Sequence, residues 1–424
     1  MRPAQSAAAR IADLLATYCP DGVEYKAIKE VYTRLRGTPI TARKMKEIVS
    51  DNGEIKIFAG GKTVINAHEK DIPHANIIDV PAVLIQSRGV IDAIYYERPF
   101  TFKNEMWAYT AADKDSVKYL YYVIKNNIEI FRNAASGMGS LPQISLSVTE
   151  DFQIPVPPLD AQREIVRILD TFTALTTELQ TERTQRLRQY EYYRDMLLSE
   201  EYLTQLSATL GKGQSSRHIE VNSYPLCELF HIKNGYTPSK RVKSYWQNGT
   251  VPWFRMEDIR EHGHILDDAI QKVHPDGVKG ELFPANSIMM ATTATIGVHA
   301  LVQVDYLANQ QFTNFALKPE YAGAVDMKYV YYYFYLIDDW AKRNVNASSF
   351  ASVKMEELKA YRIPVPPLAV QRQVVEILDK LETLCRDVTA GLPREIALRE
   401  RQYEYYRERL LTFPRQRAQE GGVR

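Results

Sequence analysis

Residues 154–170 read Ile-Pro-Val-Pro-Pro-Leu-Asp-Ala-Gln-Arg-Glu-Ile-Val-Arg-Ile-Leu-Asp, and residues 363–379 read Ile-Pro-Val-Pro-Pro-Leu-Ala-Val-Gln-Arg-Gln-Val-Val-Glu-Ile-Leu-Asp. The two stretches begin 209 residues apart (363 minus 154). Each is followed by a second shared motif, Gln-Tyr-Glu-Tyr-Tyr-Arg, at residues 189–194 and 402–407. Self-similarity over a long interval indicates a duplicated structural unit. The sequence therefore predicts two halves, each ending in a Pro-Pro turn and a long helix.

Apolar residues in both helical segments recur at alternating intervals of three and four, which is typical of a coiled-coil seam. The first of these helices, if it runs from Leu159 to Leu198, would be about 60 Å long, which is too long for the core of a small domain. The motif Gly391-Leu392-Pro393 predicts a break in the second helix. We interpret the two helices as one antiparallel coiled coil within the chain, with ordinary amphipathic core helices as the alternative. The predicted seam residues are Ile165, Ile168, Phe172, Leu175 and Leu179, paired in pattern with Val374, Ile377, Leu381, Leu384 and Val388.

The remaining sequence mixes short apolar runs with helical spacing and predicts an α/β (α+β) fold. We expect two globular lobes, related by an internal pseudo-two-fold repeat and joined by the two long helices. The expected segments are an N-terminal helix (1–20), a first lobe (21–158), a central helix (159–206), a second lobe (207–367), a distal helix (368–412) and a basic tail (413–424).

Composition sets limits on location and partners. The 424 residues are 45% hydrophobic and 25% charged, as in ordinary globular proteins. The formal net charge is only +1, so nucleic-acid binding would have to depend on local basic patches. Three widely separated cysteines favour a reducing cytoplasm over a disulfide framework. The sequence contains no run of 18 apolar residues, so we expect a cytoplasmic protein without a membrane segment.

The motifs of common catalytic and metal sites are missing or incomplete. The Pro-Pro pairs follow Val156 and Val365, which cannot accept a hydrogen bond from a target amino group as a methyltransferase motif requires. The nearest approach to a nucleotide-binding loop, residues 60–63, lacks its first glycine. His262 and His264 have no third ligand nearby in sequence. We therefore predict no catalytic residue and no metal site in this chain.

Basic side chains alternate with aromatic and amide residues in both lobes, beside Gly-Thr-Pro or Gly-x-Thr-Pro turns. Lysine and arginine neutralise phosphates, and arginine and glutamine can contact base edges in pairs of hydrogen bonds. A solvated charged surface is the alternative interpretation. The candidate DNA-binding residues are Arg36, Lys44, Lys62, Gln86 and Arg88 in the first lobe and Lys233, Thr237, Lys240, Arg255 and Thr292 in the second.

Together, the repeated Pro-Val-Pro-Pro-Leu-x-x-Gln-Arg and Gln-Tyr-Glu-Tyr-Tyr-Arg motifs and the Pro-Trp-Phe-Arg stretch resemble the specificity subunit of type I restriction-modification enzymes. The resemblance implies two target-recognition lobes, each reading one half of a bipartite double-stranded DNA sequence. Four-residue units in residues 173–184 resemble the spacer repeats of some members.

The same resemblance implies partners that carry the chemistry. Two modification (methyltransferase) subunits would hold S-adenosylmethionine, and a restriction/translocase subunit would use ATP, so no cofactor is expected in this chain. The chain itself would recognise DNA and would not be an enzyme. Two alternatives remain: a coiled-coil scaffold with two protein-binding lobes, and a methyltransferase- or nuclease-like enzyme.

Overall fold

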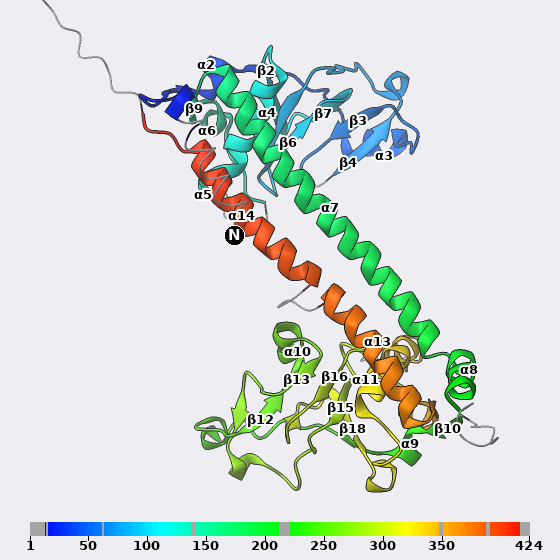
Figure 1. Ribbon diagram of the computed structural model, residues 1–424. Coiled ribbons are helices and arrows are strands. Elements are labelled where there is room, and N and C mark those ends of the chain that lie inside the picture. Colours follow the sequence, from blue (N-terminus) through cyan, green and yellow to red (C-terminus); the bar gives the residue numbers. More distant parts are fainter. Residues whose placement is uncertain are drawn as a thin grey trace, which may run out of the picture. The chain divides into compact units, whose positions relative to one another are not determined.

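The computed structural model describes residues 13, 16–61, 63–136, 141–211, 221–346, 351–386 and 391–415. The chain divides into two compact units, residues 1–180 with 395–424, and residues 181–394. Helix α7 (Leu159–Leu197) begins in the first unit and ends in the second (Figure 1). Most of the predicted N-terminal helix and of the basic tail lies outside the described residues. Among those described, no helix is long and apolar enough to cross a membrane.

The first unit contains a globular lobe followed by the start of α7. Its strands are β1 (Glu24–Ala27), β2 (Thr33–Leu35), β3 (Ile55–Phe58), β4 (Val64–Ala67), β5 (Ala82–Gln86), β6 (Asp92–Tyr96), β7 (Phe100–Phe102), β8 (Met106–Thr110) and β9 (Gln153–Val156). Its helices are α2 (Ile28–Val31), α3 (Ala42–Ile48), α4 (Lys114–Asn126), α5 (Ile128–Asn133) and α6 (Leu146–Glu150), with a 3₁₀ turn η1 (Glu69–Asp71). Helix α14 (Gly391–Leu411) returns to this unit from residue 395 onward.

Two sheets form the first lobe, with strand orders β2-β8-β5-β6 and β4-β3-β7. Strand β5 is buried along its whole length and is apolar up to its last residue, Gln86. Val83 and Ile85 pack in the core cluster that includes α4, and Ala82 and Leu84 pack in a cluster with Phe100 of the small sheet. Asp113 starts α4 by accepting hydrogen bonds from the backbone N–H groups of Asp115 and Ser116. The sheet that carries α4 therefore forms the core of this lobe.

The second unit repeats this layout. Its strands are β10 (Asn222–Pro225), β11 (Phe230–Asn234), β12 (Val251–Phe254), β13 (Ile265–Leu266), β14 (Lys272–Val273), β15 (Ser287–Ala291), β16 (His299–Val302), β17 (Leu307–Ala308), β18 (Phe312–Leu317) and β19 (Arg362–Val365). Its helices are α8 (Glu200–Gly211), α9 (Leu226–Leu229), α10 (Met256–His262), α11 (Met327–Arg343), α12 (Met355–Ala360) and α13 (Leu368–Arg386). Its 3₁₀ turns are η2 (Lys243–Trp246), η3 (Pro275–Gly277) and η4 (Pro319–Tyr321).

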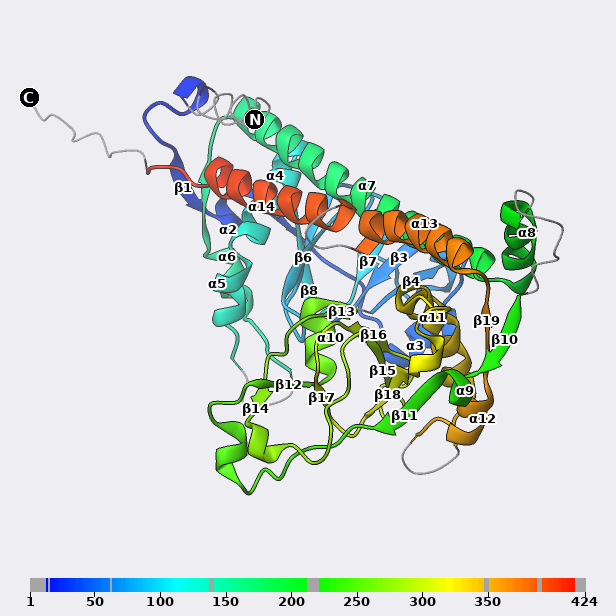
Figure 2. The same cartoon turned by 60° about the horizontal axis from the view of Figure 1, so that its bottom comes forward.

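Sheet topology confirms the duplication. The second lobe has the orders β11-β18-β15-β16-β13 and β14-β12-β17, so each strand of the first lobe's two sheets has a counterpart. The parallel pair of the small sheet also recurs, as β3 with β7 and as β12 with β17. Helix α11 lies against β15 and β16, in the place that α4 takes in the first lobe (Figure 2). The two halves therefore share one fold despite their divergent sequences.

In the first unit, α7 and α14 run antiparallel. The rings of Phe172 and Tyr406 lie 5.4 Å apart, and Gln180 Nε2 donates to Glu400 Oε1 at 3.2 Å. Moving forward along α7 thus means moving backward along α14. Figures 1 and 2 both show α14 beside the first part of α7. The antiparallel arrangement predicted from the sequence is confirmed in this unit.

The predicted seam is only partly correct. Ile165 and Val374 are fully buried, whereas Leu384 is 39% exposed and Leu378 and Cys385 are buried in its place. The prediction of Leu384 as a seam residue is therefore wrong, and the next residue, Cys385, is buried instead. The reason is that α13 packs against α11 of its own lobe. The other described seam residues are half-buried, since a narrow helix pair leaves one side in solvent; they are Ile168, Phe172, Leu175, Leu179, Ile377 and Leu381. Val388 lies outside the described residues.

Both long helical segments are interrupted. The central helix ends at Leu197 instead of reaching residue 206, and Ser199 starts α8 by accepting a hydrogen bond from the Tyr202 N–H at 3.2 Å. Helix α14 begins at Gly391, whose φ is +65°. A Cβ atom there would lie 2.5 Å from the carbonyl oxygen of Thr383, so only glycine fits without a shift. The Gly-Leu-Pro motif thus marks a real change of helix.

The repeated glutamine holds the Pro-Pro turn. Gln162 donates to the Pro157 carbonyl oxygen at 2.9 Å, and Gln371 donates to that of Pro366 at 2.6 Å. Both side chains are buried. In the second lobe the same amide also accepts a hydrogen bond from the Asp326 N–H and donates to the Ala324 carbonyl. The glutamine of the motif therefore fixes the path of the chain from each lobe into its helix.

A repeated aspartate joins each lobe to its long helix, and we call this cluster of one aspartate, one lysine and one tyrosine the lobe–helix joint. The lysine ammonium approaches one carboxylate oxygen and the tyrosine hydroxyl donates to the other. The distances are 2.7 and 2.5 Å for Asp170 with Lys118 and Tyr122, and 2.8 and 2.5 Å for Asp379 with Lys328 and Tyr332. Each aspartate is the last residue of its repeated stretch, so the repeat encodes the joint.

Replacing the two motif glutamines should have unequal effects. Gln371→Ala removes three hydrogen bonds in a buried site, and we expect the second lobe to lose about 2–4 kcal/mol of stability. Gln162→Ala is the matched control, because Gln162 donates one hydrogen bond and its Oε1 has no partner in the part of the chain that the structure describes. Its cost should be about 1 kcal/mol. Scanning calorimetry measures both, and an equal or larger loss for Gln162→Ala would contradict this account.

Candidate nucleic-acid interface

Two tryptophans organise the basic segment of the second lobe. The rings of Trp246 and Trp253 meet edge to face, with centroids 4.9 Å apart. Their indole N–H groups donate to the main-chain carbonyls of Ser239, at 3.2 Å, and Tyr236, at 3.1 Å. These contacts tie the loop between β11 and η2 to β12. Residues 236–247 therefore have a fixed path over the small sheet.

A surface hollow of about 400 Å³ lies beside this pair and is called the lysine hollow below. It is lined by Lys240, Lys243, Trp246, Gln247 and Gln271. Within the described part of the chain, neither lysine forms an ion pair and no carboxylate lines the hollow. Lys240 was predicted to contact DNA, and the structure places it in a positively charged depression that suits phosphates. Gln271 was missed, because only the strand pairing of β14 with β12 brings it there.

Arg255 follows β12 and starts α10. Its guanidinium lies over the Trp253 ring at 5.5 Å from the centroid, and its Nε is 3.8 Å from Glu257 Oε2. That Nε has no hydrogen-bond partner among the described residues. The backbone N–H of Arg255 donates to Asp258, which also accepts from the Ile270 N–H. A guanidinium held by stacking and a distant carboxylate keeps most of its donors for another molecule.

The other second-lobe candidates separate into surface and buried residues. Lys233 is exposed on β11, and Thr237 is half-buried with its hydroxyl donating to Gln310. Thr292 is buried and shares a 2.8 Å hydrogen bond with the hydroxyl of Thr313. Thr292 follows the central strand β15 and its hydroxyl is engaged within the lobe, so its role at DNA stays a prediction that burial does not favour.

In the first lobe, Arg36 and Arg88 are exposed and Lys44 is half-buried on α3. Gln86 is buried, and its amide donates to the Gly61 carbonyl oxygen at 2.6 Å. The polar group of Gln86 is engaged with a neighbouring loop, so its role at DNA stays a prediction that burial does not favour. Lys62 lies outside the described residues. Of the described candidates in this lobe, Arg36, Lys44 and Arg88 have accessible side chains.

The first lobe has a hollow of opposite charge. It measures about 620 Å³ and is lined by Glu54, His68, Glu69, Lys70 and Ala75. A hydrogen bond from the backbone N–H of Glu69 and another from His68 lower the pKa of Glu54 to about 2. Glu54 therefore stays ionised at neutral pH and disfavours phosphate at this place.

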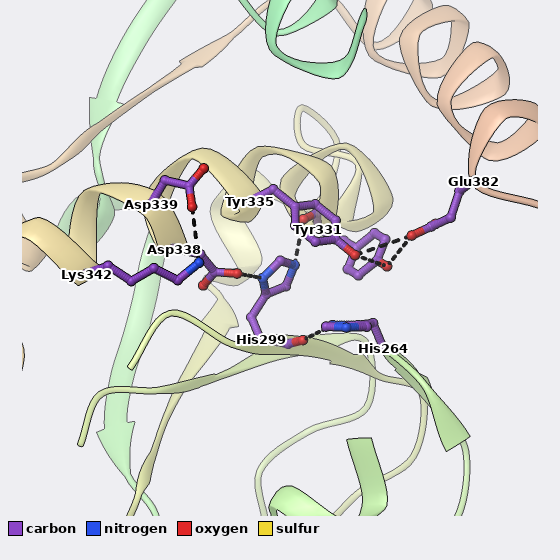
Figure 3. A network of polar contacts seen from close by, with 8 residues as sticks. All are labelled: His264, His299, Tyr331, Tyr335, Asp338, Asp339, Lys342 and Glu382. Atoms are coloured by element: carbon purple, nitrogen blue, oxygen red, sulfur yellow. Dashed lines mark hydrogen bonds and ion pairs between the residues drawn. The ribbon is translucent and has the colours of Figure 1, made fainter. Parts of the chain in front are cut away.

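A buried polar network supports the core of the second lobe (Figure 3). His299 on β16 is fully buried, with Nδ1 2.5 Å from Asp338 Oδ2 and Nε2 2.9 Å from the Tyr331 carbonyl oxygen. A carbonyl oxygen only accepts, so Nε2 donates to Tyr331, and Nδ1 shares the second hydrogen bond with the carboxylate. His264 donates from Nδ1 to the main-chain oxygen of His299 at 2.7 Å, so it serves the loop before β13.

The same network extends to α13. The hydroxyls of Tyr331 and Tyr335 approach Glu382 Oε1 at 3.0 and 3.3 Å (Figure 3). Burial, and then the charge of Glu382, raise the pKa of the adjacent Tyr332 far above neutral, so it stays a hydrogen-bond donor. Strand β16, helix α11 and helix α13 are thus joined by polar contacts. Among the described residues, no group of three or more side chains is arranged to hold a metal ion.

Comparison with known proteins identifies this duplicated architecture. Residues 20–189 and 219–398 each match the family described as the type I restriction modification DNA specificity domain. The chain belongs to this family. Within it, the EcoR124I/EcoR124II specificity subunit of Escherichia coli is 35% identical over 86% of this chain and 88% of that protein. The EcoprrI specificity subunit of E. coli is 47% identical, but over 46% of this chain and 51% of that relative.

Solved structures of the specificity family share the fold. The S subunit of a type I restriction-modification system from M. genitalium has a TM-score of 0.54 and 14% identity, covering 92% of this chain and 96% of that one. A chain from a study of type I complex assembly gives the same TM-score and identity. The predicted family and the predicted fold class, two lobes with long helices and an internal repeat, are therefore confirmed.

Breaking the buried histidine–aspartate pair should destabilise the second lobe. His299→Leu leaves Asp338 buried without its partner, and we expect a loss of about 3–5 kcal/mol. The double variant His299→Leu/Asp338→Leu should recover most of that loss, because it removes both polar members of the buried pair. Denaturant unfolding measures the difference.

Asp339→Ala is the control for this pair. Asp339 forms an exposed ion pair with Lys342 at 3.1 Å, so its removal should cost less than about 1 kcal/mol. A double variant as unstable as His299→Leu alone would show that packing, and not the unpaired charge, sets the cost.

Proposed function

We propose that this chain is the DNA-specificity subunit of a type I restriction-modification complex, in which each lobe reads one half of a bipartite sequence. The observation that carries the proposal is the duplicated lobe on a shared helix, which coincides with the two matches to the specificity family. Two copies of one fold with different surfaces suit two different half-sites. The lysine hollow and the acidic hollow are such a difference.

The surface residues of the lobes divide by chemistry. Lys233, Lys240 and Lys44 would neutralise phosphates, whereas Arg36, Arg88 and Arg255 can donate two hydrogen bonds to a guanine edge. Stacking on Trp253 supports this role for Arg255, because it restrains the guanidinium before DNA arrives. Half-site recognition would thus combine general attraction with a few base contacts.

The proposal places the chemistry on partner proteins. Two modification subunits would bind S-adenosylmethionine and methylate DNA, and a restriction/translocase subunit would use ATP. The repeated lobe–helix joint supports two equivalent docking places for the modification subunits, one for each half of the chain. This chain would contribute recognition without catalysis, and it would act in the cytoplasm.

Methylation mapping tests the proposed function. The chain is co-expressed with the modification subunit of the same operon in a host that lacks type I systems, and methylated bases are located by sequencing. We expect one bipartite motif with a fixed gap. Absence of sequence-specific methylation or DNA protection would favour the scaffold alternative. Transfer of labelled methyl groups by the purified chain alone would favour the enzyme alternative.

The spacing between half-sites is proposed to depend on residues 173–184 of α7. This stretch is helical throughout and includes the boundary between the two compact units at Gln180 and Thr181. The hydroxyls of Thr173, Thr176 and Thr177 donate to main-chain oxygens four residues earlier, so these threonines do not interrupt the helix. A four-residue repeat in such a helix is suited to changes of length.

Inserting one more four-residue unit after Thr184 should lengthen the gap by one or two base pairs. Four residues add about 6 Å of rise and about 400° of turn, a net rotation near 40°. B-DNA has a turn of roughly 34–36 Å for about 10.5 base pairs, so the step is commensurate with it. Each half-site should keep its bases, which methylation mapping can verify. Altered half-site bases with an unchanged gap would exclude α7 as the spacer.

A further inference from the structure

The lysine hollow contains two amides with unused hydrogen-bonding capacity. Gln247 follows η2 and Gln271 precedes β14, and both line the hollow. Among the described residues, neither side-chain amide has a hydrogen-bond partner. By contrast, the glutamines of the Pro-Pro motif are buried and bonded. Two unpaired amides and two unpaired lysines on one concave surface, within the described part of the chain, form a polar site that is suited to bind a planar polar ligand.

The support of the hollow is rigid. Trp246 forms part of its lining and is fixed by its hydrogen bond to Ser239 and its contact with Trp253. Gln271 is held through its backbone, because its carbonyl accepts a hydrogen bond from the Trp253 N–H at 3.0 Å. Side chains on a restrained backbone lose less entropy when they bind. The backbone positions of Gln247 and Gln271 are therefore fixed by their contacts with the Trp246–Trp253 pair.

The acidic hollow of the first lobe lies at a different place on the fold. Glu54 and Glu69 line it beside the start of β3 and the end of β4. Gln271 of the lysine hollow lies before the start of β14, which is the counterpart of β4. The lysine hollow is therefore defined by its own residues, two lysines and two glutamines beside a tryptophan.

We propose that Gln247 and Gln271 determine specificity for adenine in the half-site of the second lobe, while Lys240 and Lys243 neutralise the flanking phosphates. This inference rests on the proposed function. A glutamine amide can accept from adenine N6–H and donate to adenine N7, a pattern that no other base offers in the major groove. Among the described residues, no carboxylate lines the hollow to repel the DNA backbone. Each glutamine reads one A·T pair, so at most two positions depend on this site.

The test uses the assembled methyltransferase complex and methylation mapping. Gln247→Ala and Gln271→Ala should each relax one A·T position by about 10- to 100-fold, in the same half-site. The other half-site and the gap should stay unchanged. Gln205→Ala on α8 is the matched control, since it removes an exposed amide from the same unit. Thermal unfolding of the variants verifies that the fold is retained.

The two lysines of the hollow should affect DNA binding differently from the glutamines. Lys240→Ala and Lys243→Ala should weaken binding on all sequences alike and lower the slope of log K against log salt by about 1 each. Lys380→Ala, which removes an exposed charge paired with Glu376, should leave that slope unchanged. A glutamine variant that leaves every position unchanged, or that relaxes a G·C pair, would overturn the proposal. A parent complex without any bipartite motif would instead overturn the proposed function.

Discussion

One carboxylate in each half determines how the chain is built. Asp170 and Asp379 each accept a lysine ammonium on one oxygen and a tyrosine hydroxyl on the other, at nearly the same distances. The lysine and tyrosine belong to the lobe, and the aspartate belongs to the long helix. A carboxylate that binds a partner on each oxygen restrains the orientation of the helix as well as its distance from the lobe. Together with the buried glutamine of the Pro-Pro turn, the joint makes each lobe and its helix one body.

The joint also explains why the two halves are nearly identical in sequence at the Pro-Pro stretch and dissimilar in the sheets. The residues that form it contact one another and recur in both halves: the aspartate ends the Pro-Pro stretch, and the lysine and tyrosine lie on α4 and α11. The sheets need only burial, so their sequences can diverge while the strand orders stay the same. The duplication, the helix break at Gly391 and the antiparallel helices could therefore be predicted from the sequence.

The candidate site was less predictable, for reasons that particular residues make clear. Gln86 and Thr292 have suitable chemistry, but Gln86 is the last residue of the central strand β5 and Thr292 follows the central strand β15. Both side chains are buried, with hydrogen bonds to Gly61 and Thr313. Gln271 has no motif around it and reaches the lysine hollow through a two-residue strand. Leu384 fits a coiled-coil heptad, yet α13 packs against α11. Periodicity alone does not say which neighbour a helix will have.

The first compact unit is assembled from distant parts of the chain. Tyr25 donates to the Phe413 carbonyl oxygen at 2.9 Å, and the Val23 N–H donates to that of Pro414 at 3.0 Å. During synthesis, residues 181–394 leave the ribosome before residues 395–415, so the second unit can fold first although the first unit was begun earlier. Until its last helix arrives, the first lobe exposes the apolar surface on which Tyr406 and Leu410 will pack. Transiently exposed apolar surface is prone to association, so this surface is protected only once the last helix has been made.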